Sequence, residues 1–101
     1  MSDPALLVLA SLADADKHGY AMMEDIKVFA GVWLGPGTLY GAITRLVKRG
    51  WIRPLDDEDR RRPYRLTAEG RLHLREQLAG LERIVKTGFE RLEDPRPAVV
   101  P

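Results

Sequence analysis

Gly35-Pro36-Gly37-Thr38-Leu39-Tyr40-Gly41-Ala42-Ile43-Thr44-Arg45-Leu46-Val47-Lys48-Arg49-Gly50 is the stretch that decides the fold, because it predicts a helix with both ends marked. Pro36 suits the first helical position, where its missing N–H costs nothing, and Gly50 suits the left-handed residue after the last turn. Apolar residues recur at steps of three and four and predict one buried stripe: Leu39, Ala42, Ile43, Leu46 and Val47.

The opposite face of this helix is polar, with hydroxyls near its start and cations near its end. It carries Thr38, Gly41, Thr44, Arg45 and Lys48, with Tyr40 and Arg49 at its margins. Such a face suits a helix laid in a DNA major groove. An ordinary surface helix, whose last-turn cations complement its own dipole, fits the same residues. The helix alone leaves both interpretations open.

Composition indicates one small soluble domain. The chain has 101 residues, of which 45% are hydrophobic and 31% charged, and it has no cysteine, which excludes disulfides and cysteine-ligated zinc. No apolar run reaches transmembrane length, and the opening residues lack the basic region of a signal peptide, so we expect no membrane association and a cytoplasmic location.

Positive charge is concentrated in one part of the chain. The net charge is only +1, but residues 45–65 hold eight of the 16 cations. A local concentration of this kind is typical of a nucleic-acid-binding surface.

Two helices are expected before the central stretch. Asp3-Pro4 marks the start of the first, which is apolar almost all round up to Ala13 and therefore needs apolar cover on two sides. The second is expected over residues 19–30, with Gly31 as its stop. We expect 32–34 to form a minor strand. The buried face of the second helix is predicted to comprise Met22, Ile26, Phe29 and Ala30, with Met22 and Met23 as core filler rather than the lining of a ligand cavity.

Residues 51–55 and 62–66 are predicted to be strands. Each contains a proline, so neither is expected in the middle of a sheet, and an isolated two-stranded hairpin at the domain edge is the natural arrangement. Three helices followed by a basic hairpin is the order of a winged helix-turn-helix. That order favours the DNA interpretation of the central helix.

A long helix follows, capped by Thr67 and extending from Ala68 to Leu92 or Glu93. Its length of about 38 Å exceeds what so small a core needs. A two-position heptad seam runs along it, and this seam requires another helix as cover. The seam residues are Leu74, Leu78, Leu81, Val85, Gly88 and Leu92, broadened by Ile84 and Phe89.

These elements predict a mainly α (α+β) fold in three parts. Residues 1–67 form the winged helix-turn-helix, residues 68–93 the C-terminal dimerisation helix, and residues 94–101 a disordered tail.

Between Leu6 and Leu92 the sequence resembles the PadR-like transcriptional regulators, in their short form with one C-terminal helix. Three blocks in order carry the resemblance: His18-Gly19-Tyr20, then Pro36-Gly37-Thr38-Leu39-Tyr40 followed by Leu46, then Arg60-Arg61-Arg62-Pro63-Tyr64-Arg65-Leu66-Thr67-Ala68-Glu69-Gly70. The third block alone also resembles MarR-like winged helices. Gly35 and Gly41 depart from the serine and proline that the family often has there, and glycine makes the first helical turns less rigid.

The resemblance implies a homodimeric repressor that binds a pseudo-palindromic double-stranded operator and is released by a small apolar effector. It also implies that the C-terminal helix packs with its mate and with the partner's first helix. The candidate interface residues are Leu6, Leu9, Leu74, Leu78, Leu81, Val85, Phe89 and Leu92. The effector is expected among Leu6, Leu9, Phe89 and Leu92.

Hydroxyls and cations supply the expected DNA contacts. The candidates are Pro36, Gly37, Thr38, Tyr40, Thr44, Arg45, Lys48, Arg60, Arg61 and Arg62. Arg45 is the best candidate for a bidentate contact to guanine. The wing arginines are expected to contact phosphates or to enter a narrow minor groove. Tyr40 could instead pack under the wing. The wing arginines could instead pair with the adjacent acids at 56–59.

Nothing in the sequence assembles a catalytic site, so we expect no enzyme activity, cofactor or metal. His18 is predicted to order a helix entry, and His73 has no second ligand at helical spacing except carboxylates. The alternative function is a protein-interaction adaptor, a winged helix without specific DNA binding, which the acidic wing tip favours.

Overall fold

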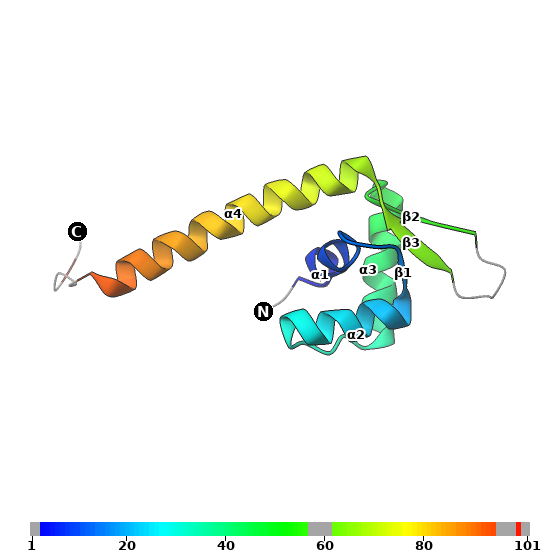
Figure 1. Cartoon of the computed structure of the whole chain (residues 1–101), viewed down its shortest axis with the longest axis horizontal. Helices are drawn as coiled ribbons and strands as arrows, with labels where there is room; N and C mark the ends of the chain where they lie inside the picture. The colour runs from blue at the N-terminus through cyan, green and yellow to red at the C-terminus, as the bar shows by residue number, and fades with distance from the viewer. Residues whose placement is uncertain (1–2, 57–61, 95–98, 100–101) are drawn as a thin grey trace.

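The computed structural model describes residues 3–56, 62–94 and 99 of the chain (Figure 1). Its elements in order are α1 (Pro4–Ser11), β1 (Lys17–His18), α2 (Gly19–Ala30), α3 (Pro36–Arg49), β2 (Ile52–Pro54), β3 (Pro63–Leu66) and α4 (Ala68–Glu93). Three helices and a small sheet form the body, and α4 extends far beyond it, so the molecule measures 63 × 26 × 21 Å.

The capping geometry confirms the predicted starts of α1 and α4 and the predicted stops of α2 and α3, whereas α1 ends at Ser11 and not at Ala13. The Asp3 carboxylate accepts a hydrogen bond from the Ala5 N–H at 3.0 Å, and the Thr67 hydroxyl accepts one from the Gly70 N–H at 3.0 Å. Gly31 and Gly50 end α2 and α3 with φ of 67° and 76°, in the left-handed region that favours glycine.

The core lies where α1, α2 and α3 meet. The α3 stripe is buried as predicted, with Val47 only half-buried. Met22, Met23 and Ile26 are buried on α2, which confirms both methionines as core residues. The prediction for Phe29 is wrong: 48% of its surface is exposed, because it lies at the edge of the α2 face that packs on the core, whereas Ala30 in the same turn packs against the core.

The sheet has three strands rather than two, in the order β1-β3-β2 and antiparallel throughout. The unexpected strand is β1, at Lys17–His18, whereas residues 32–34 form no strand. The central strand is β3, which corrects the expectation that neither hairpin strand lies in the middle. Its proline is tolerated because Pro63 is the first residue of the strand.

Only the start of α4 belongs to the body. Gly70 and Leu74 are buried there, and the seam beyond them is exposed in the single chain. The exposed fraction rises from 43% at Leu81 to 79% at Leu92. The seam therefore lacks the cover that its heptad pattern requires. Most of the tail predicted at 94–101 lies outside the described residues, so the three-part division stays a prediction.

Among residues 3–56, 62–94 and 99, no helix combines the length and the apolar character needed to cross a bilayer.

Candidate nucleic-acid interface

The polar face of α3 is exposed along its whole length. Burial of the stripe fixes the rotation of the helix, because side chains on the opposite face must then point to solvent. Thr38, Tyr40, Thr44, Arg45 and Lys48 are all exposed. The Thr44 hydroxyl donates its proton to the Tyr40 carbonyl oxygen at 2.9 Å, so its oxygen can still accept a hydrogen bond. The structure thus brings these predicted contact residues to one surface, together with Pro36 and Gly37 at the helix start.

The Tyr40 ring packs against the start of α2. A Cβ at Gly19 would overlap the Tyr40 hydroxyl and lie 2.7 Å from its Cζ, so only glycine leaves room for the ring. The neighbouring His18 accepts the Ala21 N–H with Nδ1 at 3.3 Å, which confirms that it orders the helix entry. Tyr40 nevertheless keeps 46% of its surface exposed.

Arg45 lies toward one flank of α3 rather than at its centre. It lines a hollow together with Arg49, Trp51 and His73, on the side that faces α1 and α4. The Arg49 guanidinium sits over the Trp51 indole, 5.1 Å from the ring centroid. Thr44 and Lys48 are exposed and do not line this hollow.

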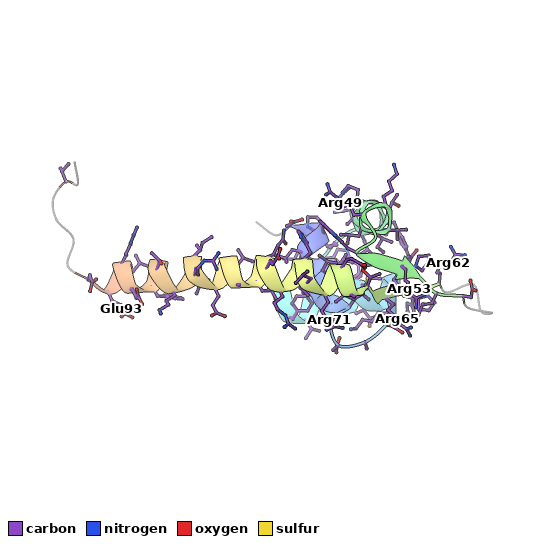
Figure 2. The ribbon with its side chains drawn as sticks, turned by 90° about the horizontal axis from the view of Figure 1, so that it is seen from above. Arg49, Arg53, Arg62, Arg65, Arg71 and Glu93 are labelled. Atoms are coloured by element: carbon purple, nitrogen blue, oxygen red, sulfur yellow. The ribbon has the colours of Figure 1, made fainter. Side chains whose placement is uncertain are left out.

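The wing carries two arginines that sequence reasoning did not single out. Arg53 and Arg65 are exposed and face each other across the β2–β3 ladder (Figure 2). Arg62 is also exposed, near the wing end of the molecule. The predicted contacts of Arg60 and Arg61, and most of the acids thought to pair with them, lie outside the described residues. Opposed strand register is the signal that would have identified the Arg53–Arg65 pair.

Asp16 clamps the wing to the turn before β1. Its carboxylate accepts Arg65 Nη2 at 2.8 Å and Nε at 3.2 Å, a bidentate pair between residues far apart in sequence. The hydrogen bond and charge of Arg65, with a smaller contribution from Arg53, hold the pKa of Asp16 below its usual value. The clamp reduces the repulsion between the two opposed arginines.

Replacing Asp16 with asparagine is expected to lower the melting temperature at pH 7, by a difference that shrinks as the pH falls below about 3.9. The pKa of Asp16 is depressed in the folded state, so its stabilising effect is present above the unfolded pKa of about 3.9 and is lost as the pH falls through the folded pKa. Thermal unfolding of both chains from pH 7 to 2 measures this, with Glu76→Gln as the control on an exposed acid of α4. A gap between parent and Asp16→Asn that stays constant with pH would contradict the clamp.

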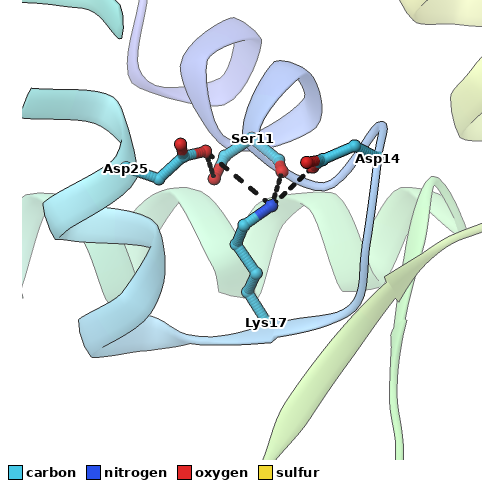
Figure 3. Close-up of polar contacts among 4 residues, drawn as sticks. All are labelled: Ser11, Asp14, Lys17 and Asp25. Atoms are coloured by element: carbon cyan, nitrogen blue, oxygen red, sulfur yellow. Dashed lines mark hydrogen bonds and ion pairs between the residues drawn. The ribbon is translucent and has the colours of Figure 1, made fainter. Parts of the chain in front are cut away.

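A second polar network holds β1 to the two helices beside it (Figure 3). Lys17 Nζ donates to the Ser11 carbonyl oxygen and to Asp14 Oδ1, the latter at 2.6 Å, and it lies 3.8 Å from Asp25 Oδ2. The buried Ser11 hydroxyl donates to the same Asp25 oxygen at 2.7 Å. Because β1 pairs with β3, this network also fixes the position of the wing.

A groove of about 1040 Å³ separates the start of α1 from the middle of α4. Leu6, Leu81 and Ile84 supply apolar side chains to it, and Gly88 leaves space at its far end. Two of the predicted interface residues are placed elsewhere. Leu9 and Leu74 are buried in the chain's own core, with 1% and 5% of their surface exposed, because helices of the same chain already cover them.

Acidic side chains and histidines do not gather into a metal site in the part of the chain that the structure describes. His73 stacks on Trp51 instead of facing carboxylates, with ring centroids 3.7 Å apart.

The chain is similar to known proteins both in sequence and in structure. The chain is 42% identical over 89 residues to an uncharacterized 37.1 kDa protein in transposon TN4556 of Streptomyces fradiae; the match covers 88% of this chain and 26% of that protein. The chain thus spans about a quarter of that relative's length.

Two solved structures share the fold. A transcriptional regulator from Clostridium thermocellum superposes with a TM-score of 0.76 at 26% identity, covering 90% of each chain. A PadR family transcription regulator from Clostridium difficile gives a TM-score of 0.79 at 24% identity, covering 88% of this chain and 97% of that one.

The family comparison reaches most of the body. The model of the transcriptional regulator PadR-like family matches residues 8–76, which include the whole exposed face of α3, the wing and the joint with α4. This confirms the winged-helix fold and the resemblance seen in the three sequence blocks. The chain therefore belongs to the PadR-like family of transcriptional regulators.

Proposed function

We propose that this PadR-like regulator is a homodimeric repressor that binds a pseudo-palindromic DNA operator through α3 and the wing. The observation that carries the proposal is the division of α3 into a buried apolar stripe and an exposed face of hydroxyls and cations. A helix held in this way can enter a major groove while the body contacts the flanking phosphates. The wing adds Arg62 on one side.

The uncovered seam of α4 supports a second copy as its partner. Leu78, Val85 and Leu92 are each between 46% and 79% exposed at heptad spacing, which is a costly arrangement for a helix in water. Packing against an identical helix would cover both seams at once. It would also hold two winged-helix domains, here called heads, in one dimer, as two half-sites about 34–36 Å apart require.

An apolar effector fits the groove between α1 and α4. Of the four residues expected to hold the effector, only Leu6 lines this groove. Leu81 and Ile84 supply further apolar lining, and Arg91 lies at one end. A ligand bound there would contact the helix that we assign to dimerisation, so it would change the relation between the two heads. Hydrophobic dye binding that is unaffected by substitutions along this groove would argue against the site.

Selection of bound duplexes from a random DNA pool tests the function and the dimer together. The expected result is an enriched sequence with two inverted half-sites whose centres lie about one helical turn apart. Enrichment of a single half-site would remove the dimer from the proposal. The absence of any enriched duplex would favour the adaptor alternative.

Replacing Lys48 with alanine is expected to weaken operator binding and to lower the magnitude of the salt slope by about one per head, because one phosphate contact releases about one counterion. Binding titrations at several salt concentrations measure the slope. Arg75→Ala is the matched control, since Arg75 is an exposed cation on α4 away from this face. An unchanged slope in Lys48→Ala, or an equal change in the control, would exclude Lys48 from the interface.

A further inference from the structure

The start of α4 is fixed to the turn that follows α3. The Trp51 carbonyl oxygen accepts the Thr67 N–H at 3.0 Å, and the Thr67 hydroxyl donates to the Gly50 carbonyl oxygen at 2.6 Å. Gly70 then packs directly on the Trp51 carbonyl, where a Cβ would have no room. These contacts join the end of the reading helix to the beginning of the long helix.

An aromatic stack continues this joint one turn further along α4. The Trp51 and His73 rings are stacked with centroids 3.7 Å apart and an angle of 16° between their planes. The Arg49 guanidinium lies over the same indole at 5.1 Å. Three side chains, from α3, the turn and α4, are thus in contact through one indole ring.

Small changes at this joint have large effects at the other end of α4. Leu92 lies nineteen residues beyond His73, which is about 28 Å along a helix. A tilt of about 10° at the joint would move that end by about 5 Å, more than the rise of about 3.4 Å between base pairs. The angle between α4 and the body therefore decides where the winged-helix domain of the second copy in a dimer meets the duplex.

We propose that Trp51 and His73 are positioning residues whose stack sets the half-site spacing that this regulator accepts. The DNA consequence rests on the proposed function, whereas the rigidity of the joint does not. His73 acts through Trp51 and α4, and it lies on another element than Thr44 and Lys48 of the exposed α3 face. The stack therefore governs the choice between spacings rather than the affinity of one head for one half-site.

Distances between spin labels test the rigidity of the joint. The chain has no cysteine, so Val28→Cys on α2 and Lys86→Cys on α4 place two labels at exposed positions, and excess unlabelled chain isolates the distance within one copy. A narrow distribution is expected in the labelled parent, in His73→Phe and in the control Glu76→Ala, and a broader or shifted one in His73→Ala. A parent-like distribution in folded His73→Ala would overturn the proposal. If circular dichroism shows that His73→Ala is unfolded, His73→Leu is used in its place, because leucine keeps more volume than alanine and has no planar ring.

Duplexes whose half-site spacing differs by one or two base pairs test the DNA consequence. His73→Phe is expected to keep the preference of the parent, and His73→Ala to shift or flatten it while binding a single half-site as the parent does. A broadened label distance with an unchanged spacing preference would overturn the role in spacing. If the parent prefers no duplex at all, the proposed function fails, and the label distances still decide whether the stack holds the joint.

Discussion

Replacing Gly70 with alanine is expected to lower the free energy of unfolding by about 2 kcal/mol and to loosen α4 from the body. The added Cβ would overlap the Trp51 carbonyl oxygen and lie 2.7 Å from the Trp51 carbonyl carbon and 2.9 Å from Leu66 Cδ1. Alanine gains about 1 kcal/mol of helix propensity, but the obstacle is backbone, which cannot rotate away, and overpacking costs about 1–3 kcal/mol or more. The steric cost therefore exceeds the gain.

Thermal unfolding of Gly70→Ala measures this effect, expected as a fall of about 8–16 °C for a domain of this size. Gly80→Ala is the matched control on the same helix. The nearest atom to a Cβ at Gly80 is Arg83 Nη2 at 3.7 Å, so the control is expected to gain stability from helix propensity. Equal melting temperatures for the parent and Gly70→Ala would show that α4 does not need this close approach.

Replacing Val85 with aspartate is expected to dissociate the dimer and to reduce operator affinity at least about 100-fold. In the single chain Val85 is 54% exposed, so the fold of one copy tolerates the charge. In the proposed dimer two carboxylates would be buried without partners, and an uncompensated buried charge costs about 3–5 kcal/mol. A cost of about 2.7 kcal/mol already corresponds to a factor of 100.

Sedimentation equilibrium and a mobility-shift titration with the selected operator measure the two consequences separately. Lys86→Asp introduces the same side chain at the next position, which is exposed and lies outside the seam. This control is expected to leave the sedimentation mass of the parent unchanged. A Val85→Asp chain that remains a dimer would place the interface elsewhere on the molecule.

Local rules predicted the elements of this fold because their signals lie within a few residues of one another. Asp3 and Thr67 cap helices by bonding to N–H groups two and three residues ahead, and Gly31 and Gly50 end helices through their own backbone angles. Such interactions need no information from distant parts of the chain.

Contacts between distant residues were beyond these rules. The pairing of β1 with β3 joins two short segments, and β1 has no strand pattern that a periodicity would detect. Asp16 finds Arg65 forty-nine positions away. Phe29 fits the apolar spacing of α2 and is still 48% exposed, because spacing alone does not show how wide a face of the helix the core covers.

The sequence by itself determined the order of the elements, the face that α3 buries and the family that the chain resembles. All three depend on residue type and short-range spacing. Only the tertiary structure decided which residues share a surface: Tyr40 against Gly19, Arg53 opposite Arg65, and Trp51 stacked on His73. It also placed Leu9 and Leu74 in the core and left the rest of the seam exposed. Periodicity marks a side chain as apolar, but the shape of the packed body determines whether the chain itself or a partner covers it.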